Sequence, residues 1–288
     1  MDADQLVLFT SKGIVVGGIY ALIALGFNLI YNTTGIVNFT QGEFVMLGGL
    51  LAGWAYSVLH LPMAVAIMLA LFVSIAMGML LEFAALRPAK KGSVVTLIII
   101  TIGASIVIKG LTAFFWGTDP YVLPALAEGK SIDLAGTQIA FHNLYIIIVT
   151  ILLMLGMVVF LKATWTGRAM QACAQNRRAA RLMGISVSRM SNLSFALSAL
   201  LGGIGGIMVT PITSMSFDQG TMLGLKGFCA AILGGISNPL GCVLGGLTIG
   251  LLEQFGTWID SSAGQVFALV IVVLMLLVRP QGLLGKKK

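Results

Sequence analysis

The stretch GIVVGGIYALIALGFNLIY at residues 13–31 contains no charged residue, and it decides the fold class. A helix needs about 20 mainly apolar residues to cross the hydrocarbon core of a bilayer, and this stretch approaches that length. Further mainly apolar runs extend over residues 61–81, 93–108, 144–161, 192–210 and 265–278, and a run with polar residues near its start extends over residues 36–59. The sequence therefore predicts an all-α, polytopic integral membrane protein, a helical bundle that works inside a lipid bilayer.

The region 222–256 is long enough for two short apolar segments, which Ser237, Asn238 and Pro239 divide at a strong turn signal. Because its arms are short, the sequence leaves open whether this hairpin crosses the membrane fully or is re-entrant. With the longer runs, it brings the bundle to about eight or nine membrane segments.

The overall composition excludes a soluble domain. Of the 288 residues, 58% are hydrophobic and 9% are charged, whereas a soluble domain carries about 25% charged residues. The 36 glycines suit membrane helices, which use small residues to bring backbones close together. Cys173, Cys229 and Cys242 show no metal-ligand spacing, and we expect no disulfide among them.

The basic residues predict the orientation. They gather in one loop, in a second loop and at the C-terminus, as Arg87, Lys90, Lys91, then Lys162, Arg168, Arg177, Arg178, Arg181, Arg189, then Arg279 and residues 286–288. The positive-inside rule places all three clusters in the cytoplasm. The acidic residues then fall outside, and they are Asp2, Asp4, Asp119, Glu128, Asp133, Asp218 and Asp260. We therefore expect the N-terminus outside and the C-terminus in the cytoplasm. Since the start MDAD lacks the basic residues of a signal peptide, the first apolar segment should stay as an anchor.

Two segments suggest an internal duplication. Residues 38–42, NFTQG, lead into MLGGL at 46–50, and residues 238–241, NPLG, lead into VLGGL at 243–247. Each would form a hairpin whose turn lies on the cytoplasmic side. Chance matching of glycines in a glycine-rich chain is the alternative.

The apolar run 36–59 begins with the polar residues Asn38, Gln41 and Glu43. Such side chains need partners, because hydrocarbon offers none. In one interpretation they cap a helix and bond to neighbouring turns. In the other, Asn38 and Gln41 line the inner part of a pore, with the hairpin at Asn238 opposite them. The sequence leaves both open, and the candidates for a translocation path are Asn38, Gln41, Glu43 and Asn238.

No catalytic constellation appears in the sequence. His60 and His142 lie at predicted outer loop edges, and neither stands beside a serine, cysteine or carboxylate in a nucleophile or metal pattern. No glycine-rich phosphate loop ending in Lys-Ser or Lys-Thr is present, so the chain itself is not expected to bind ATP in the usual way. We expect no enzyme activity, no cofactor and no metal, and energy coupling would need a partner.

The segment 164–190 is the most informative cytoplasmic stretch. Residues 167–183 are predicted to form one amphipathic helix, with Gly184 as its C-terminal cap. One face would carry Ala169, Ala172, Cys173, Ala180 and Met183, and another would carry the arginines at 177, 178 and 181. A basic helix of this kind can rest on lipid headgroups. Nucleic acid is a poor partner for it, because the helix is tethered between two membrane spans.

This segment resembles the cytoplasmic loop of bacterial ABC importer permeases. The signature of that loop is Glu-Ala-Ala, three residues and Gly; Ala179, Ala180 and Gly184 match it, while Arg178 stands in place of the glutamate. Other segments resemble the branched-chain amino acid permeases, and they are YALIALG at 20–26, VNFTQGE at 37–43, KGFCAAILGG at 226–235 and RPQGLLG at 279–285. The resemblance covers nearly the whole chain in order.

The resemblance implies a single permease domain over residues 1–288, in a bacterial inner membrane. Such a permease pairs with a second, similar permease, is powered by two cytoplasmic ATPase subunits and receives substrate from a periplasmic binding protein. The substrate would be a branched-chain amino acid, or else urea, an amide or an aromatic acid. A coupling loop at about 163–190 would dock on an ATPase, and its candidate coupling residues are Arg168, Ala172, Arg178, Ala179, Ala180 and Gly184.

An autonomous carrier or channel is the alternative. It would need a relay of buried ionisable residues, because a charge in mid-bilayer costs roughly 2.5–3.5 kcal/mol and is kept for function. Long charged side chains near a membrane boundary instead snorkel to water. The residues expected to do so lie toward the outer boundary, and they are Lys12, Lys109, Lys226 and Glu253. Glu82 is expected near the inner boundary, close to Arg87. Glu43 is then the only relay candidate, and one residue makes a poor relay. A membrane enzyme would need a nucleophile with a base, which the sequence lacks.

Overall fold

The computed structural model describes residues 3–89, 92–125, 131–134, 137–259, 270, 273, 277 and 282–284. Some residues that entered the orientation argument lie outside this part, namely Asp2, Lys90, Lys91, Glu128, Asp260, Arg279 and residues 286–288. Most of the predicted last span at 265–278 also lies outside it.

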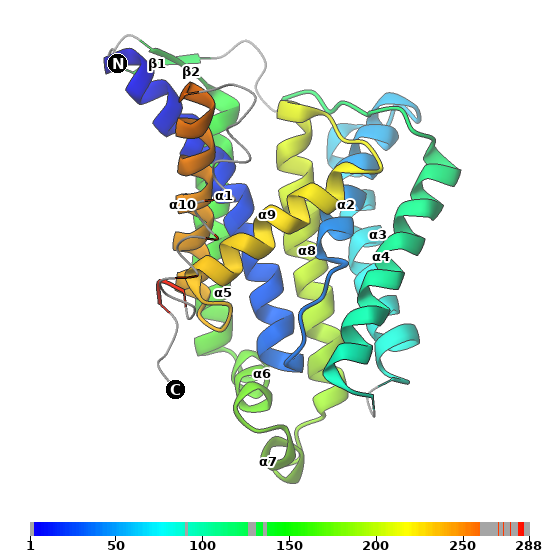
Figure 1. Cartoon of the computed structure of the whole chain (residues 1–288). Coiled ribbons are helices and arrows are strands. Elements are labelled where there is room, and N and C mark those ends of the chain that lie inside the picture. The colour runs from blue at the N-terminus through cyan, green and yellow to red at the C-terminus, as the bar shows by residue number, and fades with distance from the viewer. Residues whose placement is uncertain are drawn as a thin grey trace. The chain divides into compact units, whose positions relative to one another are not determined.

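Helices make up most of the described chain, and they coincide with the predicted apolar runs (Figure 1). An apolar run favours a helix in a membrane because hydrocarbon offers its backbone groups no partner outside the segment. The long helices are α1 (Ala3–Thr34), α2 (Gln41–Ser57), α3 (Met63–Leu80), α4 (Val94–Trp116), α5 (Phe141–Ala163), α8 (Val187–Thr213), α9 (Gln219–Gly234) and α10 (Pro239–Ile259).

Shorter elements complete the described chain. They are the π turn η1 (Leu81–Leu86), which continues α3, the helices α6 (Trp165–Gln175) and α7 (Arg177–Leu182), and the strands β1 (Ser131–Leu134) and β2 (Thr137–Ala140). The strands form an antiparallel hairpin, with Ser131 opposite Ala140. This hairpin is a small departure from the all-helical prediction, and it belongs to the predicted outer loop.

The described chain divides into two compact units. The terminal unit contains residues 1–24, 124–155 and 226–288, and the central unit contains residues 25–123 and 156–225. Three of the four boundaries fall inside helices, namely α1, α5 and α9, and the fourth lies between Leu123 and Pro124 in the connection after α4.

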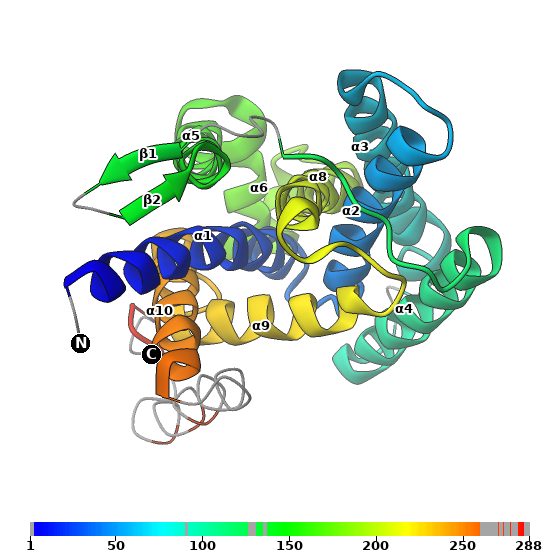
Figure 2. The ribbon, with the colours of Figure 1, turned by 90° about the horizontal axis from the view of Figure 1, so that it is seen from above.

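In the central unit, α2 and α3 pack along α8 (Figure 2). Glycines allow this close approach: a Cβ atom on Gly206 of α8 would overlap the carbonyl of Val45, and one on Gly48 of α2 would overlap the backbone of Gly203. A buried apolar cluster forms part of the core of this unit, and it contains Ile30, Ile36, Phe44, Leu81, Leu86, Phe195 and Ala199.

In the terminal unit, the first part of α1 packs against α10 in the same manner. A Cβ atom on Gly250 would overlap the backbone of Gly17, and one on Gly246 would overlap Ala21. At the turn between α9 and α10, Gly234 and Gly241 are so close that neither could carry a side chain without a shift of the other's backbone. The glycines of the LGGL segment at 244–247 therefore allow α10 to pack closely against neighbouring helices.

Six described helices are long and apolar enough to cross a membrane, and they extend over Gln5–Thr34, Met63–Leu86, Val94–Trp116, Phe141–Ala163, Val187–Thr213 and Pro239–Trp258. Within the central unit, the most apolar window of α8 is 78% buried, whereas that of α4 is 11% buried. Helix α4 exposes large side chains such as Ile106, Phe114 and Phe115. Exposed apolar surface on this scale suits contact with lipid.

The connections of the central unit identify its two ends. At one end, Asn192 at the start of α8 donates from Nδ2 to the carbonyl of Met79 in α3, at 3.1 Å. At the other end, Tyr121 after α4 and Met215 after α8 exchange two backbone hydrogen bonds of 2.9 Å. The loop at Arg87 and the helices α6 and α7 therefore lie at the same end of this unit (Figure 1).

Candidate functional site

Asn38 forms a tight polar turn immediately before α2. Its Oδ1 accepts a hydrogen bond from the backbone N–H of Thr40 at 3.2 Å and another from the Thr40 hydroxyl. In such a turn the asparagine side-chain oxygen accepts a hydrogen bond that a backbone carbonyl would accept inside a helix. Asn38 is fully buried, and its Nδ2 has no partner among the described residues. The Nδ2 group of Asn38, a residue of the predicted path, is thus available to donate a hydrogen bond.

Gln41 joins α2 to the two helices beside it. Its Nε2 donates to the carbonyl of Ser198 in α8 at 3.2 Å, and its Oε1 accepts from the Ser198 hydroxyl. The Ser198 hydroxyl also lies 2.8 Å from the carbonyl of Gly26 in α1. Both ends of the buried Gln41 amide are therefore occupied inside the protein. Ser198 was not singled out from the sequence, and no local signal marks it.

Glu43 lies two residues after Gln41, about half a turn further along α2, in a polar setting made by two other helices. Its Oε1 accepts from Ser105 of α4 at 2.9 Å and, less closely, from Thr221 of α9 at 3.4 Å. The residue is buried, and Oε2 has no partner among the described residues. A buried carboxylate oxygen without a donor is costly, and it can accept a hydrogen bond from a passing ligand or from water.

Asn238 caps α10 in the terminal unit. Its Oδ1 accepts from the backbone N–H groups of Leu240 and Gly241, at 3.1 and 3.4 Å, and its Nδ2 donates to the carbonyl of Leu284 at 3.3 Å. Pro239 takes the first helical position, where no N–H is needed. The predicted turn at 237–239 is confirmed, and the side chain of Asn238 stabilises it.

The prediction of a single helix over residues 167–183 is wrong. The segment forms two helices, because Asn176 adopts an extended conformation between them and its Oδ1 accepts from the N–H groups of Arg178 and Ala179. Asparagine is a strong helix N-cap, and here the cap outweighs continuous helical periodicity. The predicted apolar face is broken as a result, and Met183 is 82% exposed.

Gly184 ends α7 as predicted. Its φ is +81°, a left-handed conformation that glycine adopts without strain. The N–H of Ile185 donates to the carbonyl of Ala180 at 3.0 Å, and the N–H of Gly184 donates to that of Arg181 at 3.1 Å. This is the Schellman arrangement, which turns the chain sharply after a helix.

The predicted coupling residues divide into an exposed and a covered group. Arg168, Arg178, Ala179 and Gly184 are exposed, Ala172 is half-buried and Ala180 is buried. Large apolar side chains accompany the exposed group, since Trp165 is 87% and Leu182 is 89% exposed. Exposed aromatic and aliphatic side chains beside arginines are typical of a surface that meets a partner.

Arg177 anchors this segment, and sequence reasoning missed its role. Its Nη2 donates to the carbonyl of Thr33 at the end of α1, at 2.9 Å. Burial raises the pKa of the neighbouring Cys173 thiol, so this cysteine stays protonated and behaves as a packing residue. The structure thus fixes one side of α7 to the helices and leaves the other side open.

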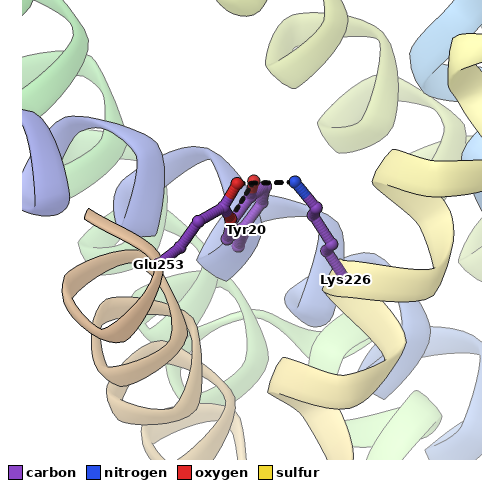
Figure 3. A network of polar contacts seen from close by, with 3 residues as sticks. All are labelled: Tyr20, Lys226 and Glu253. Atoms are coloured by element: carbon purple, nitrogen blue, oxygen red, sulfur yellow. Dashed lines mark hydrogen bonds and ion pairs between the residues drawn. The ribbon is translucent and has the colours of Figure 1, made fainter. Parts of the chain in front are cut away.

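A buried ion pair lies in the terminal unit, and it corrects the expectation that Lys226 and Glu253 snorkel to water. Lys226 Nζ of α9 lies 2.7 Å from Glu253 Oε1 of α10, and Tyr20 of α1 donates its hydroxyl to Glu253 Oε2 at 2.8 Å (Figure 3). Lys226 Nζ also lies 5.5 Å from the centre of the Tyr20 ring. The charges are satisfied by each other, which costs less than leaving either one unpaired.

Comparison with known proteins decides the family. Residues 9–279 match the family described as the branched-chain amino acid transport system, permease component. The chain belongs to this family. The permease is also 31% identical to the high-affinity branched-chain amino acid transport permease BraD of Pseudomonas aeruginosa, over 96% of this chain and 94% of that protein. It is 30% identical to the Escherichia coli K12 permease LivH, over 99% and 98% of the two chains.

A solved structure supports the fold of the permease. The structure described as PsaBC from Streptococcus pneumoniae in complex with Fab matches with a TM-score of 0.52 and 13% identity, over 94% of this chain and 90% of that one. Together with the apolar helices, these findings identify the permease as a multi-pass membrane protein of transporter fold.

Proposed function

We propose that this permease forms the membrane path of an ABC importer for branched-chain amino acids, powered by separate cytoplasmic ATPases. The observation that carries the proposal is the match to the branched-chain permease family over residues 9–279, with BraD and LivH as full-length relatives. An importer of urea, amides or aromatic acids within the same family is the second candidate. The partners would be a second, similar permease, two ATPase subunits and a periplasmic binding protein.

We propose that the basic end of the central unit faces the cytoplasm. The loop at Arg87 and the segment with α6 and α7 lie at the same end, which supports a common side for these two basic clusters. The N-terminus would then be outside, and about eight or nine segments would cross or enter the membrane. Helices α2 and α9, with 17 and 16 residues, would be its short segments.

We propose that α6 and α7 dock on an ATPase subunit. The exposed group, with Arg168, Arg178, Ala179 and Gly184, would make the contact, while Ala172 and the buried Ala180 would shape the surface from beneath. Support comes from the open side of α7 and from the exposed apolar side chains beside it. The bond from Arg177 to α1 would carry movement of α7 into the membrane helices.

We propose that the start of α2 borders the translocation path. Asn38 Nδ2 and Glu43 Oε2 are polar atoms without partners among the described residues, so they can bond to substrate or water. Gln41 would border the path by holding α2 against α8, and Asn238 would act through the turn that it caps. A path with few polar groups suits a small apolar amino acid, with specificity supplied by the binding protein.

The experiment is uptake into proteoliposomes that contain the permease with its native partners. Radiolabelled leucine, isoleucine and valine should accumulate with ATP inside and the binding protein outside, while urea, acetamide and benzoate should not. Accumulation of urea or benzoate instead would select the second candidate. Leucine uptake without any ATPase subunit would overturn the importer proposal and favour an autonomous carrier.

A further inference from the structure

A groove of about 730 Å³ runs along the outside of the central unit, between α3 with η1 on one side and α8 on the other. Its walls are apolar over most of their length, and they are formed by Ala76, Leu80, Phe83, Leu193 and Ala196. Leu80 is 55% and Phe83 is 59% exposed, although both lie in a segment long and apolar enough to span a membrane. The groove therefore opens toward lipid.

One end of the groove is basic. Arg87 follows η1 and Arg189 lies in the first turn of α8, and both line the groove beside Ser188. The Arg87 guanidinium lies 5.5 Å from the centre of the Phe83 ring, so it is held over the groove wall. Within the described part of the chain, neither guanidinium forms an ion pair with a carboxylate. Two positive charges thus line the end of the groove, where an anion can contact them.

Asn192 fixes the two walls relative to each other. Its Nδ2 donates to the carbonyl of Met79 in α3 at 3.1 Å and lies 3.4 Å from Glu82 Oε2 in η1. The Glu82 carboxylate is buried and does not line the groove. The charged side chains that line it are those of Arg87 and Arg189. The width of the groove is therefore set by side-chain bonds inside the protein.

The length of the groove matches one leaflet of a bilayer. The rise of an α-helix is about 1.5 Å per residue, so Ala76 and Arg87 are separated by at most roughly 16 Å along α3 and η1. Half of the hydrocarbon core is about 15 Å thick. With the arginines at the headgroup level, the apolar walls would reach the middle of the membrane.

We propose that this groove binds an anionic phospholipid, with one acyl chain along the apolar walls and the phosphate between Arg87 and Arg189. Guanidinium groups match phosphate oxygens in charge and geometry, and each can donate two parallel hydrogen bonds. Basic pockets between membrane helices at the cytoplasmic side recognise anionic headgroups in this way. An anionic lipid would neutralise these two arginines, which form no ion pair within the described residues.

The test measures phosphatidylglycerol that stays bound to the assembled transporter. The transporter is reconstituted in vesicles of phosphatidylcholine with phosphatidylglycerol, extracted in mild detergent, and its retained lipid is counted by mass spectrometry. The double variant Arg87→Gln, Arg189→Gln should lose most of the retained phosphatidylglycerol. A matched variant, Lys162→Gln, Arg181→Gln, removes the same charge from exposed positions away from the groove and should retain it.

A third variant, Ala196→Phe, fills the apolar part of the groove and leaves both arginines in place. It should also lose phosphatidylglycerol, whereas soluble glycerol 3-phosphate, which has no acyl chain, should not displace the lipid from the unchanged protein. Equal retention in all variants would overturn the proposal. So would loss of the second permease from the Ala196→Phe complex with lipid retained, because the groove would then be a subunit interface.

Discussion

Lys226 Nζ and Glu253 Oε1 lie 2.7 Å apart, with both side chains almost fully buried, and they connect α9 to α10. The Tyr20 hydroxyl adds α1 to the same contact through the second carboxylate oxygen (Figure 3). A buried charge pair is neutral overall only while both members are present. The pair therefore locks the α9–α10 hairpin of the terminal unit to α1.

Removing one member of this pair should destabilise the protein strongly. Glu253→Gln leaves the Lys226 charge buried without its counter-charge, and breaking a buried pair costs about 3–5 kcal/mol. The thermal transition in detergent should fall markedly. The double variant Glu253→Leu, Lys226→Met removes both charges, and it should recover much of the loss. An unchanged transition in Glu253→Gln would mean that water reaches the pair.

This ion pair could not be predicted from the sequence alone. Lys226 and Glu253 were visible as charges in apolar runs, but the hydrogen bonds that satisfy them join positions 27 and 233 apart along the chain. Only tertiary packing brings such positions together. The expectation of snorkelling was therefore reasonable for each residue alone and wrong for the two together.

Local signals were more informative. The apolar runs predicted the helices, and Pro239 and Gly184 marked helix ends, because each acts on the backbone beside it. Asn176 is a residue type that favours a helix N-cap, but the helical periodicity on both sides of it predicted a continuous helix. The π turn at Leu81–Leu86 has no such local signal, and neither have Ser198, Ser105 and Thr221, which bind the polar start of α2.

The contact between α2 and α8 should be sensitive to a single methyl group. Gly206→Ala places a Cβ atom against the backbone of Val45, and overpacking of this kind costs about 1–3 kcal/mol. Gly103→Ala in α4 is the matched control, because a Cβ atom there has nothing within 4 Å. We expect a lower thermal transition for Gly206→Ala and no loss for Gly103→Ala. Equal behaviour of the two would show that α2 and α8 separate easily.

The role of Gln41 can be separated from its contribution to stability. Gln41→Leu removes both hydrogen bonds between the Gln41 amide and Ser198, while the Ser198 hydroxyl keeps the carbonyl of Gly26 as a partner at 2.8 Å. The two lost bonds cost about 0.5–1.5 kcal/mol each. Ser198→Ala removes one of these bonds from the other side and is the matched control for stability. We expect Gln41→Leu to assemble and hydrolyse ATP, yet to take up leucine slowly. Full uptake by a folded Gln41→Leu variant would remove Gln41 from the path.

The orientation can be tested with two cysteines at opposite ends of the central unit. In a background without Cys173, Cys229 and Cys242, Thr118→Cys and Met183→Cys both place an exposed thiol. An impermeant thiol reagent added to intact cells should label position 118 and spare position 183 until the membrane is opened. Labelling of position 183 alone in intact cells would reverse the proposed orientation.

Gly184 offers the sharpest test of coupling. Its left-handed φ of +81° costs a leucine roughly 1–2 kcal/mol, whereas asparagine tolerates this conformation. A Cβ atom at position 184 meets nothing within 4 Å, so neither substitution creates a clash inside the permease itself.

We therefore expect Gly184→Leu to insert and assemble, but to lower leucine uptake and substrate-stimulated ATP hydrolysis together, because the turn after α7 and the docking surface both change. Gly184→Asn keeps the turn with a small polar side chain, and it should retain most of both activities. Uptake by Gly184→Leu at the level of the unchanged protein would favour the alternative in which α6 and α7 only rest on the lipid surface. Loss of uptake with normal ATP hydrolysis would assign the defect to the translocation path, and not to docking on the ATPase.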